Sequence, residues 1–211
     1  MPLQRMFLLT LLSLAVANVG IAAEQSEKTA EQAAETALKV GDKAIDGELV
    51  DSAGKKVKLS QLWHEGPLVV IWYRGGWCPV CQKHLSGIQE ALPAIKAAGG
   101  KIVAVTPELP ESSKLTAKEG GLDFPVLTDK GNELGKKYGV VFKLDPDTAK
   151  KYQEWINLEK RNGDASMELP VPVAYIINRE GVITFAFVNA NYGERVKPAD
   201  VVQALKSPHV N

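Results

Sequence analysis

The sequence lacks most of the features that would mark a binding surface or a stapled scaffold. It has only two cysteines among 211 residues, too few for a small fold held together by disulfides. Its 25 basic and 25 acidic residues balance, and no basic run occurs, which excludes an electrostatic nucleic-acid surface. It also contains no internal repeat and no low-complexity tract. What remains is a chain of ordinary composition, with a length that suits one compact domain.

The one long apolar stretch lies at the N-terminus. Arg5 precedes an apolar segment over residues 6–19, and small residues at 21–23 come before the polar Glu24. This pattern is typical of a secretory signal peptide. The segment is too short and too interrupted for a spanning helix of about 20 residues. We therefore expect residues 1–23 to be removed and the mature chain to work in the periplasm without stable membrane insertion; a retained anchor is the alternative.

The rest of the chain predicts one α/β domain. Residues 24–39 are polar and Ala-rich, which indicates a linker or a surface helix, and the domain itself spans residues 40–211. The candidate strands are two hairpins around residues 51–54 and 179–181, and three buried runs at residues 68–73, 101–106 and 173–178. A long helical pattern between the first two buried runs implies a parallel pair with a right-handed crossover. The expected fold is a mixed β-sheet with helices on both faces.

Local signals give three finer expectations. Pro93 is expected to bend or break the long helix over residues 78–98, because proline removes a helical hydrogen bond. Ser60 is a candidate N-cap for a short helix that runs to Trp63. Residues 161–170 are expected to form a loop.

Both cysteines lie in the segment Cys78-Pro79-Val80-Cys81, between a buried strand and the long helix. A helix N-terminus stabilises a thiolate, which is the reactive form of cysteine. We expect Cys78 to be a partly exposed nucleophile and Cys81 to be the more buried resolving thiol. A structural disulfide is disfavoured because so short a loop removes little chain entropy. A zinc site lacks two further ligands, and a pair of inert buried thiols remains the plain alternative.

Four segments carry a resemblance to a known family, namely residues 40–44, 73–81, 169–177 and 183–198. They resemble the thioredoxin-fold superfamily and, within it, the peroxiredoxin-like AhpC/TSA (redoxin) group. The Arg-Gly-Gly-Trp-Cys-Pro context of Cys78 narrows the match to that branch. The resemblance implies a thioredoxin-like fold of the peroxiredoxin type. It also implies a thiol-dependent peroxidase that uses an external thioredoxin-like dithiol as reductant, with no cofactor and no metal.

The resemblance also implies roles for residues around the cysteines. Arg195 or Arg74 corresponds to an arginine that stabilises the thiolate. From its position next to Cys78, Trp77 is expected to shield the sulfur and to form part of the substrate surface. Pro172 resembles a cis-proline that faces the active cysteine, with Pro170 as its rival, and the backbone of Val171 would then bind an extended peptide.

The sequence departs from the usual peroxiredoxin pattern next to Cys78. Typical members have a proline seven residues before the cysteine and a threonine or serine three residues before it, where this chain has Ile71 and Gly75. The missing hydroxyl puts peroxide reduction in question and leaves protein thiol–disulfide exchange as the alternative. A metal-binding chaperone module, with both cysteines and a distant histidine, is the non-enzymatic alternative. His84 itself is expected to be a surface or packing residue.

Overall fold

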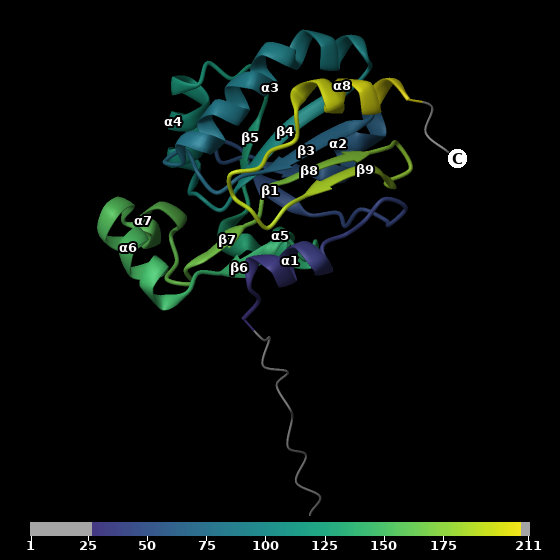
Figure 1. Ribbon diagram of the computed structural model, residues 1–211. Coiled ribbons are helices and arrows are strands. Elements are labelled where there is room, and N and C mark those ends of the chain that lie inside the picture. Colours follow the sequence, from purple (N-terminus) through teal and green to yellow (C-terminus); the bar gives the residue numbers. More distant parts are fainter. Residues whose placement is uncertain (1–26, 208–211) are drawn as a thin grey trace, which may run out of the picture.

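The structure is a computed structural model that describes residues 27–207, so the predicted signal peptide lies outside the described part. Seven strands form one sheet in the order β2-β1-β5-β4-β3-β8-β9, and two further strands, β6 and β7, pair separately (Figure 1). The strands of the main sheet are β1 (Glu48–Val50), β2 (Lys56–Lys58), β3 (Leu68–Trp72), β4 (Lys101–Thr106), β5 (Val126–Thr128), β8 (Val173–Ile177) and β9 (Ile183–Val188). The three predicted buried runs and both predicted hairpins are therefore confirmed.

The centre of the sheet follows from the predicted crossover. Strand β3 pairs in parallel with β4 and antiparallel with β8, with Val70 opposite both Val103 and Tyr175. Every residue of β3 and β8 is buried, which explains their uninterrupted apolar sequences. The sheet is mixed, as expected.

Helices cover both faces of this sheet. Helices α3 (Pro79–Ala97) and α8 (Pro198–Lys206) lie together along one face, while α1 (Ala30–Thr36) and α5 (Glu133–Lys137) lie on the other (Figure 1). Two separate clusters of buried side chains, one on each face, form the core. Helix α1 falls within residues 24–39, the segment expected to be a linker or a surface helix. Helices α2 (Leu59–Glu65) and α4 (Pro110–Glu119) complete the cover.

The expected break at Pro93 and the expected N-cap at Ser60 are both wrong. Helix α3 continues without a break through Pro93, which lies on its exposed face, where water can replace the lost hydrogen bond. Helix α2 begins at Leu59 with Lys58 as its N-cap, so Ser60 lies inside the helix. The Ser60 hydroxyl instead hydrogen-bonds to Asp46 at 2.7 Å.

A small lobe interrupts the chain between α5 and β8. It contains β6 (Val141–Lys143), α6 (Pro146–Ile156), α7 (Leu158–Asn162) and β7 (Glu168–Pro170), and α6 and α7 stand apart from the main layers (Figure 1). The loop expected at residues 161–170 is wrong, because the end of α7 and the whole of β7 fall within it. In the described residues 27–207 we find no helix that is both long and apolar enough to cross a membrane.

Candidate active site

The cysteine pair lies at the junction between strand β3 and helix α3. Strand β3 ends at Trp72, a short turn follows, and Cys78 is the N-cap residue of α3. The Cys78 sulfur accepts a hydrogen bond from the Cys81 amide at 3.3 Å. Pro79 occupies the first helical position, where its missing N–H costs nothing. The sulfur therefore takes the place of a capping oxygen at the positive end of the helix.

Both cysteines are free thiols, and both are buried. Cys78 is 1% exposed and Cys81 is 0% exposed. The expectation that Cys78 is partly exposed is therefore wrong. The reason is that the side chain packs into the core cluster beneath α3 and is covered by a guanidinium.

Arg74 provides that guanidinium. Its Nη2 donates to the Cys78 sulfur at 3.5 Å, and its Nη1 donates to the Tyr152 hydroxyl at 3.0 Å. The Arg74 side chain is buried, and none of the ion pairs found among residues 27–207 includes it. A buried cation needs a compensating partner. The anion that the site offers to Arg74 is the thiolate of Cys78.

Arg195 contacts the sulfur of Cys81. Its Nη2 donates to Cys81 at 3.1 Å, and its Nη1 donates to the carbonyls of Tyr192 and of Glu194, the latter at 2.6 Å. The structure thus brings both predicted arginines to the cysteine pair, one to each sulfur. Arg74, and not Arg195, touches the expected nucleophile.

This arrangement separates the acidities of the two thiols. The pKa of Cys78 falls from 9.0 to about 5, because its thiolate accepts a hydrogen bond from Cys81 and faces the charge of Arg74; burial opposes the shift. The pKa of Cys81 rises above 9.0, because its thiol donates to Cys78 and is itself buried. At neutral pH the pair is one thiolate and one thiol, which is the state that thiol–disulfide chemistry needs.

We expect the stability of the reduced protein to reveal this acidity. Cys78 loses its proton more readily in the folded state, so the unfolded state binds more protons between about pH 5 and 9 and the free energy of unfolding rises with pH there. The contribution is complete above pH 9 and is lost as the pH falls through 5. Urea unfolding of the reduced protein, compared with Cys78→Ser across this range, measures it. Parallel curves for the two proteins would contradict the low pKa, and the oxidised protein serves as a control that lacks the thiolate.

A buried carboxylate fixes the turn before Cys78. Glu108 is 0% exposed and follows the end of β4. One of its oxygens accepts from the Gly76 amide at 2.7 Å, and the other accepts from Arg161 of α7 at 3.1 Å. Burial raises the pKa of Glu108, while the Gly76 amide and the Arg161 charge oppose that rise. The carboxylate therefore links the active-site turn, the end of β4 and the small lobe.

The turn leaves no room for a side chain at Gly75. A Cβ built there would collide with the indole of Trp77 and would lie 2.9 Å from the carboxyl carbon of Glu108. Gly76 is equally confined, because a Cβ there would overlap the Thr116 hydroxyl. The absence of a threonine or serine hydroxyl at position 75 is thus part of the local packing.

Aromatic rings surround the Arg74 guanidinium. Its central carbon lies 4.4 Å from the centre of the Tyr192 ring and 5.3 Å from that of Trp77. Trp77 in turn meets Tyr152 and Trp155 edge to face, at 5.3 and 6.1 Å. Tyr192 and Trp155 are 56% and 62% exposed, unusual for rings of this size. The structure therefore places Trp77 beside the nucleophile, as expected, under a rim of exposed aromatic residues.

Two observations bear on the predicted peptide-binding role of Val171 and Pro172. No cis peptide bond occurs among residues 27–207, so the cis-proline prediction for Pro172, and for its rival Pro170, is wrong. The Val171 amide already donates to the Val140 carbonyl at 2.9 Å. Its side chain is buried in the core cluster on the face of the sheet opposite the cysteines. Pairing of residues 168–170 with β6 draws this segment away from an open edge.

His84 is a packing residue beside the second cysteine. It is buried, and its Nε2 lies 3.1 Å from the Val196 carbonyl. Burial, together with the nearby charge of Arg195, lowers its pKa to about 4, so the ring is neutral at neutral pH. Within the described part of the chain, no group of three or more histidine, cysteine or carboxylate side chains is arranged to hold a metal ion.

The sequence interpretation missed Glu108, Tyr152, Arg161 and Tyr192. Glu108 had a signal that could have found it, because the carboxyl ends of parallel strands meet at one edge of a sheet and β3 and β4 are parallel. Tyr152 and Arg161 belong to the lobe, and no spacing along the chain links them to Cys78.

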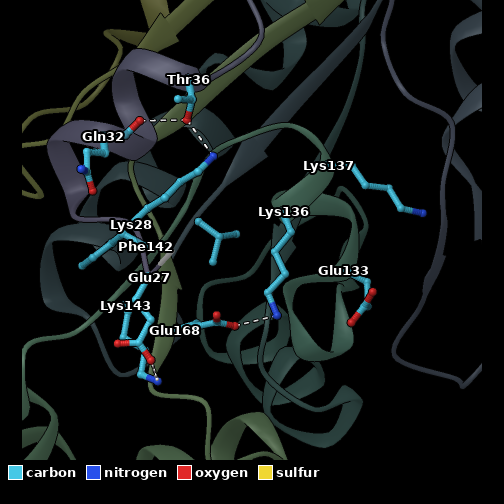
Figure 2. A pocket seen from close by; sticks show the side chains of 11 residues that line it. Glu27, Lys28, Gln32, Thr36, Glu133, Lys136, Lys137, Phe142, Lys143 and Glu168 are labelled. Carbon is cyan, nitrogen blue, oxygen red and sulfur yellow. Dashed lines mark hydrogen bonds and ion pairs between the residues drawn. The ribbon is translucent and has the colours of Figure 1, made fainter. Parts of the chain in front are cut away.

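An open pocket of about 780 Å³, lined mostly by charged side chains, lies beside α1 and α5 (Figure 2). Four of its charged side chains form two ion pairs, Lys136 with Glu168 and Lys143 with Glu27, each at 2.7 Å. Neither cysteine lines it, so it does not belong to the thiol site.

Comparison with known proteins places this geometry in a family. The model of the AhpC/TSA family matches residues 40–186. The chain is 33% identical over 119 residues to thiol-disulfide oxidoreductase ResA of Bacillus cereus (strain ATCC 10987 / NRS 248), covering 54% of this chain and 68% of the relative. It is 27% identical over 141 residues to the chloroplastic peroxiredoxin Q of Populus jackii, covering 67% and 56%.

Solved structures agree on the fold. The peroxidoxin BcpB of Mycobacterium tuberculosis superimposes with a TM-score of 0.65 at 19% identity, covering 80% of this chain and 97% of that one. A peroxiredoxin-like protein from Aquifex aeolicus gives 0.64 at 19% identity, covering 81% and 87%. The predicted thioredoxin-like fold of the peroxiredoxin type is thereby confirmed.

Proposed function

Because the chain belongs to the AhpC/TSA family, we propose that it is a thiol oxidoreductase that reduces peroxides through a Cys78–Cys81 dithiol/disulfide cycle. The observation that carries the proposal is the Cys78 sulfur at the N-terminus of α3, hydrogen-bonded by Arg74 and by the Cys81 amide. Its low pKa supplies a thiolate at neutral pH. The relatives named as a peroxiredoxin and as a thiol-disulfide oxidoreductase support the same chemistry.

The proposed cycle has three steps: oxidation of Cys78, formation of the internal disulfide, and reduction of that disulfide. The Cys78 thiolate attacks a peroxide oxygen, the O–O bond breaks, and the leaving alkoxide or hydroxide takes up a proton, which leaves Cys78 as a sulfenic acid. The Cys81 thiol then attacks that sulfur: the S–S bond forms, the S–O bond breaks, and the leaving hydroxide takes up the thiol proton and departs as water. An external dithiol reduces the disulfide by exchange and is itself oxidised. Arg195, next to Cys81, stabilises Cys81 as the leaving thiolate in that last step.

Burial of the nucleophile favours a small substrate. With Cys78 only 1% exposed, a peroxide can reach the sulfur with less rearrangement than a protein disulfide needs. Trp77 and the exposed rings of Tyr192 and Trp155 border the approach and form the proposed contact surface for substrate or reductant.

Thiol–disulfide exchange without peroxidase activity is the second candidate. The glycine at position 75 favours it, because the hydroxyl that typical peroxiredoxins use is missing there, and so does the match to ResA. In this reaction Cys78 attacks a substrate disulfide, and Cys81 then releases the second thiolate as the internal disulfide forms.

We propose that the protein is exported before it acts. The support is the signal-peptide pattern of residues 1–23, with small residues before Glu24. N-terminal sequencing of protein recovered from the periplasm of a Gram-negative host is expected to start at Glu24. An uncleaved N-terminus would indicate a retained anchor.

Mass spectrometry with one equivalent of peroxide tests the choice of substrate. In Cys81→Ser we expect Cys78 to accumulate as a sulfenic acid, trapped by dimedone, after a single turnover, whereas the unmodified protein forms the internal disulfide. Failure of peroxide to oxidise Cys78 faster than a free thiol, together with rapid reduction of a disulfide substrate, would overturn the peroxidase proposal in favour of the second candidate.

A further inference from the structure

The Arg74 guanidinium has two hydrogen-bond acceptors among the described residues. One is the Cys78 sulfur at 3.5 Å, and the other is the Tyr152 hydroxyl at 3.0 Å. The Arg74 Nε is buried and without a hydrogen-bond partner in the described part of the chain. The rings of Trp77, Tyr152 and Tyr192 contact the group but do not fix its rotation in its own plane as a hydrogen bond does. The hydrogen bond to the Tyr152 hydroxyl therefore fixes the orientation of the Arg74 guanidinium in its own plane.

Tyr152 reaches Arg74 from outside the sheet. It belongs to α6, an eleven-residue helix in which no residue is fully buried. At its C-terminal end α6 gives way, through Asn157 with a left-handed backbone, to α7, whose Leu158 is buried. A helix with so little buried surface contributes little to global stability. Its Tyr152 nevertheless contacts Arg74, which in turn contacts the sulfur of the proposed nucleophile Cys78.

We propose that Tyr152 is a positioning residue that holds the Arg74 guanidinium against the Cys78 sulfur. The hydroxyl fixes one arm of the guanidinium, and the other arm then lies on the sulfur. The reactivity of the nucleophile thus depends on how the surface helix α6 is seated. This inference rests on the proposed function, because it concerns the same thiolate, but it assigns a role to the lobe that the reaction itself does not.

The opposing possibility is that Tyr152 only packs against Trp77, with ring centres 5.3 Å apart. Packing uses the ring, whereas positioning uses the oxygen. Tyr152→Phe separates the two, because it keeps the ring and removes the hydroxyl.

The test measures the ultraviolet absorbance of the thiolate as a function of pH, in the reduced protein that comprises residues 24–211. In the unmodified protein the first transition, assigned to Cys78, is expected near pH 5. In Tyr152→Phe we expect its midpoint to rise by about one pH unit, the low end of the shifts that a neighbouring charge produces. Tyr152→Leu, which removes the ring as well, is expected to shift it at least as far.

Tyr138→Phe is the matched control. The Tyr138 hydroxyl donates to the Ile45 carbonyl at 2.9 Å in the core cluster on the face opposite the cysteines, so its removal is expected to leave the midpoint unchanged. An unchanged midpoint in Tyr152→Phe would overturn the positioning role, whatever Tyr152→Leu does, while a low midpoint in the unmodified protein would leave the proposed function standing. An ordinary thiol midpoint in the unmodified protein would instead overturn the activated thiolate on which the proposed function and this inference both depend.

Discussion

Replacement of Cys78 by serine is expected to abolish both peroxide reduction and disulfide exchange. The serine hydroxyl stays protonated at neutral pH and cannot accept an oxygen or form a disulfide, so no later step of the cycle can occur. We expect a loss of a thousandfold or more, about the size seen when other enzymes lose their nucleophile. Turnover with hydrogen peroxide and with an insulin-type disulfide substrate, each coupled to a dithiol reductant, measures the loss.

Cys81→Ser is the matched control for that experiment. It keeps the helix N-terminus, Arg74 and the nucleophile, so it is expected to react once and then stop. Residual multiple turnover in Cys78→Ser would show that Cys81 can act as the nucleophile and would reverse the roles assigned to the two sulfurs.

Arg74→Met is expected to raise the pKa of Cys78 by about one to three units. Methionine fills much of the space beside Trp77 but removes the charge and the hydrogen bond at 3.5 Å that favour the thiolate. At pH 7 a rise of three units would leave about a tenth of Cys78 as thiolate, so we expect its oxidation to slow by up to about tenfold, with the deficit shrinking as the pH rises. The thiolate also stabilises the reduced pair, so the reduction potential is expected to fall by about 30 mV per unit of pKa.

Two further arginine variants serve as comparisons for Arg74→Met. Arg179→Gln changes an exposed arginine whose guanidinium donates to the Glu65 carbonyl, far in the chain from the cysteines, so it is expected to leave the pH profile unchanged. Arg195→Gln acts on Cys81 and is expected to slow reduction of the disulfide more than oxidation of Cys78. An unchanged pH profile in Arg74→Met would show that the Cys81 hydrogen bond and the helix N-terminus activate the sulfur without Arg74.

The sheet and the cysteine site were predictable from the sequence because their signals are local. Continuous apolar runs such as residues 68–72 predict buried strands, and a helix between two of them fixes a parallel pair. The same reasoning places Cys78 at a strand-to-helix turn. The strands β6 and β7 were not predicted because each has only three residues and the two are separated by α6 and α7, whereas the equally short β1 and β2 are joined by a tight turn.

The missed features of the site depend on long-range contacts. The hydroxyl of Tyr152 meets Arg74 across 78 positions, and Arg161 meets Glu108 across 53. No local propensity encodes such pairs. Burial of Cys78 was likewise invisible, because the group that covers it, Arg74, is one that a sequence places at the surface by default.

The crowding at Gly75 limits which substitutions this position can accept. A threonine installed there, to restore the hydroxyl of typical peroxiredoxins, would drive its Cβ into the Trp77 indole and toward Glu108. The single substitution would therefore disrupt the turn before it supplied any new contact to a peroxide. A threonine at position 75 would need a smaller residue at position 77 and a shift of the Glu108 carboxyl at the same time, so a single replacement does not install the hydroxyl.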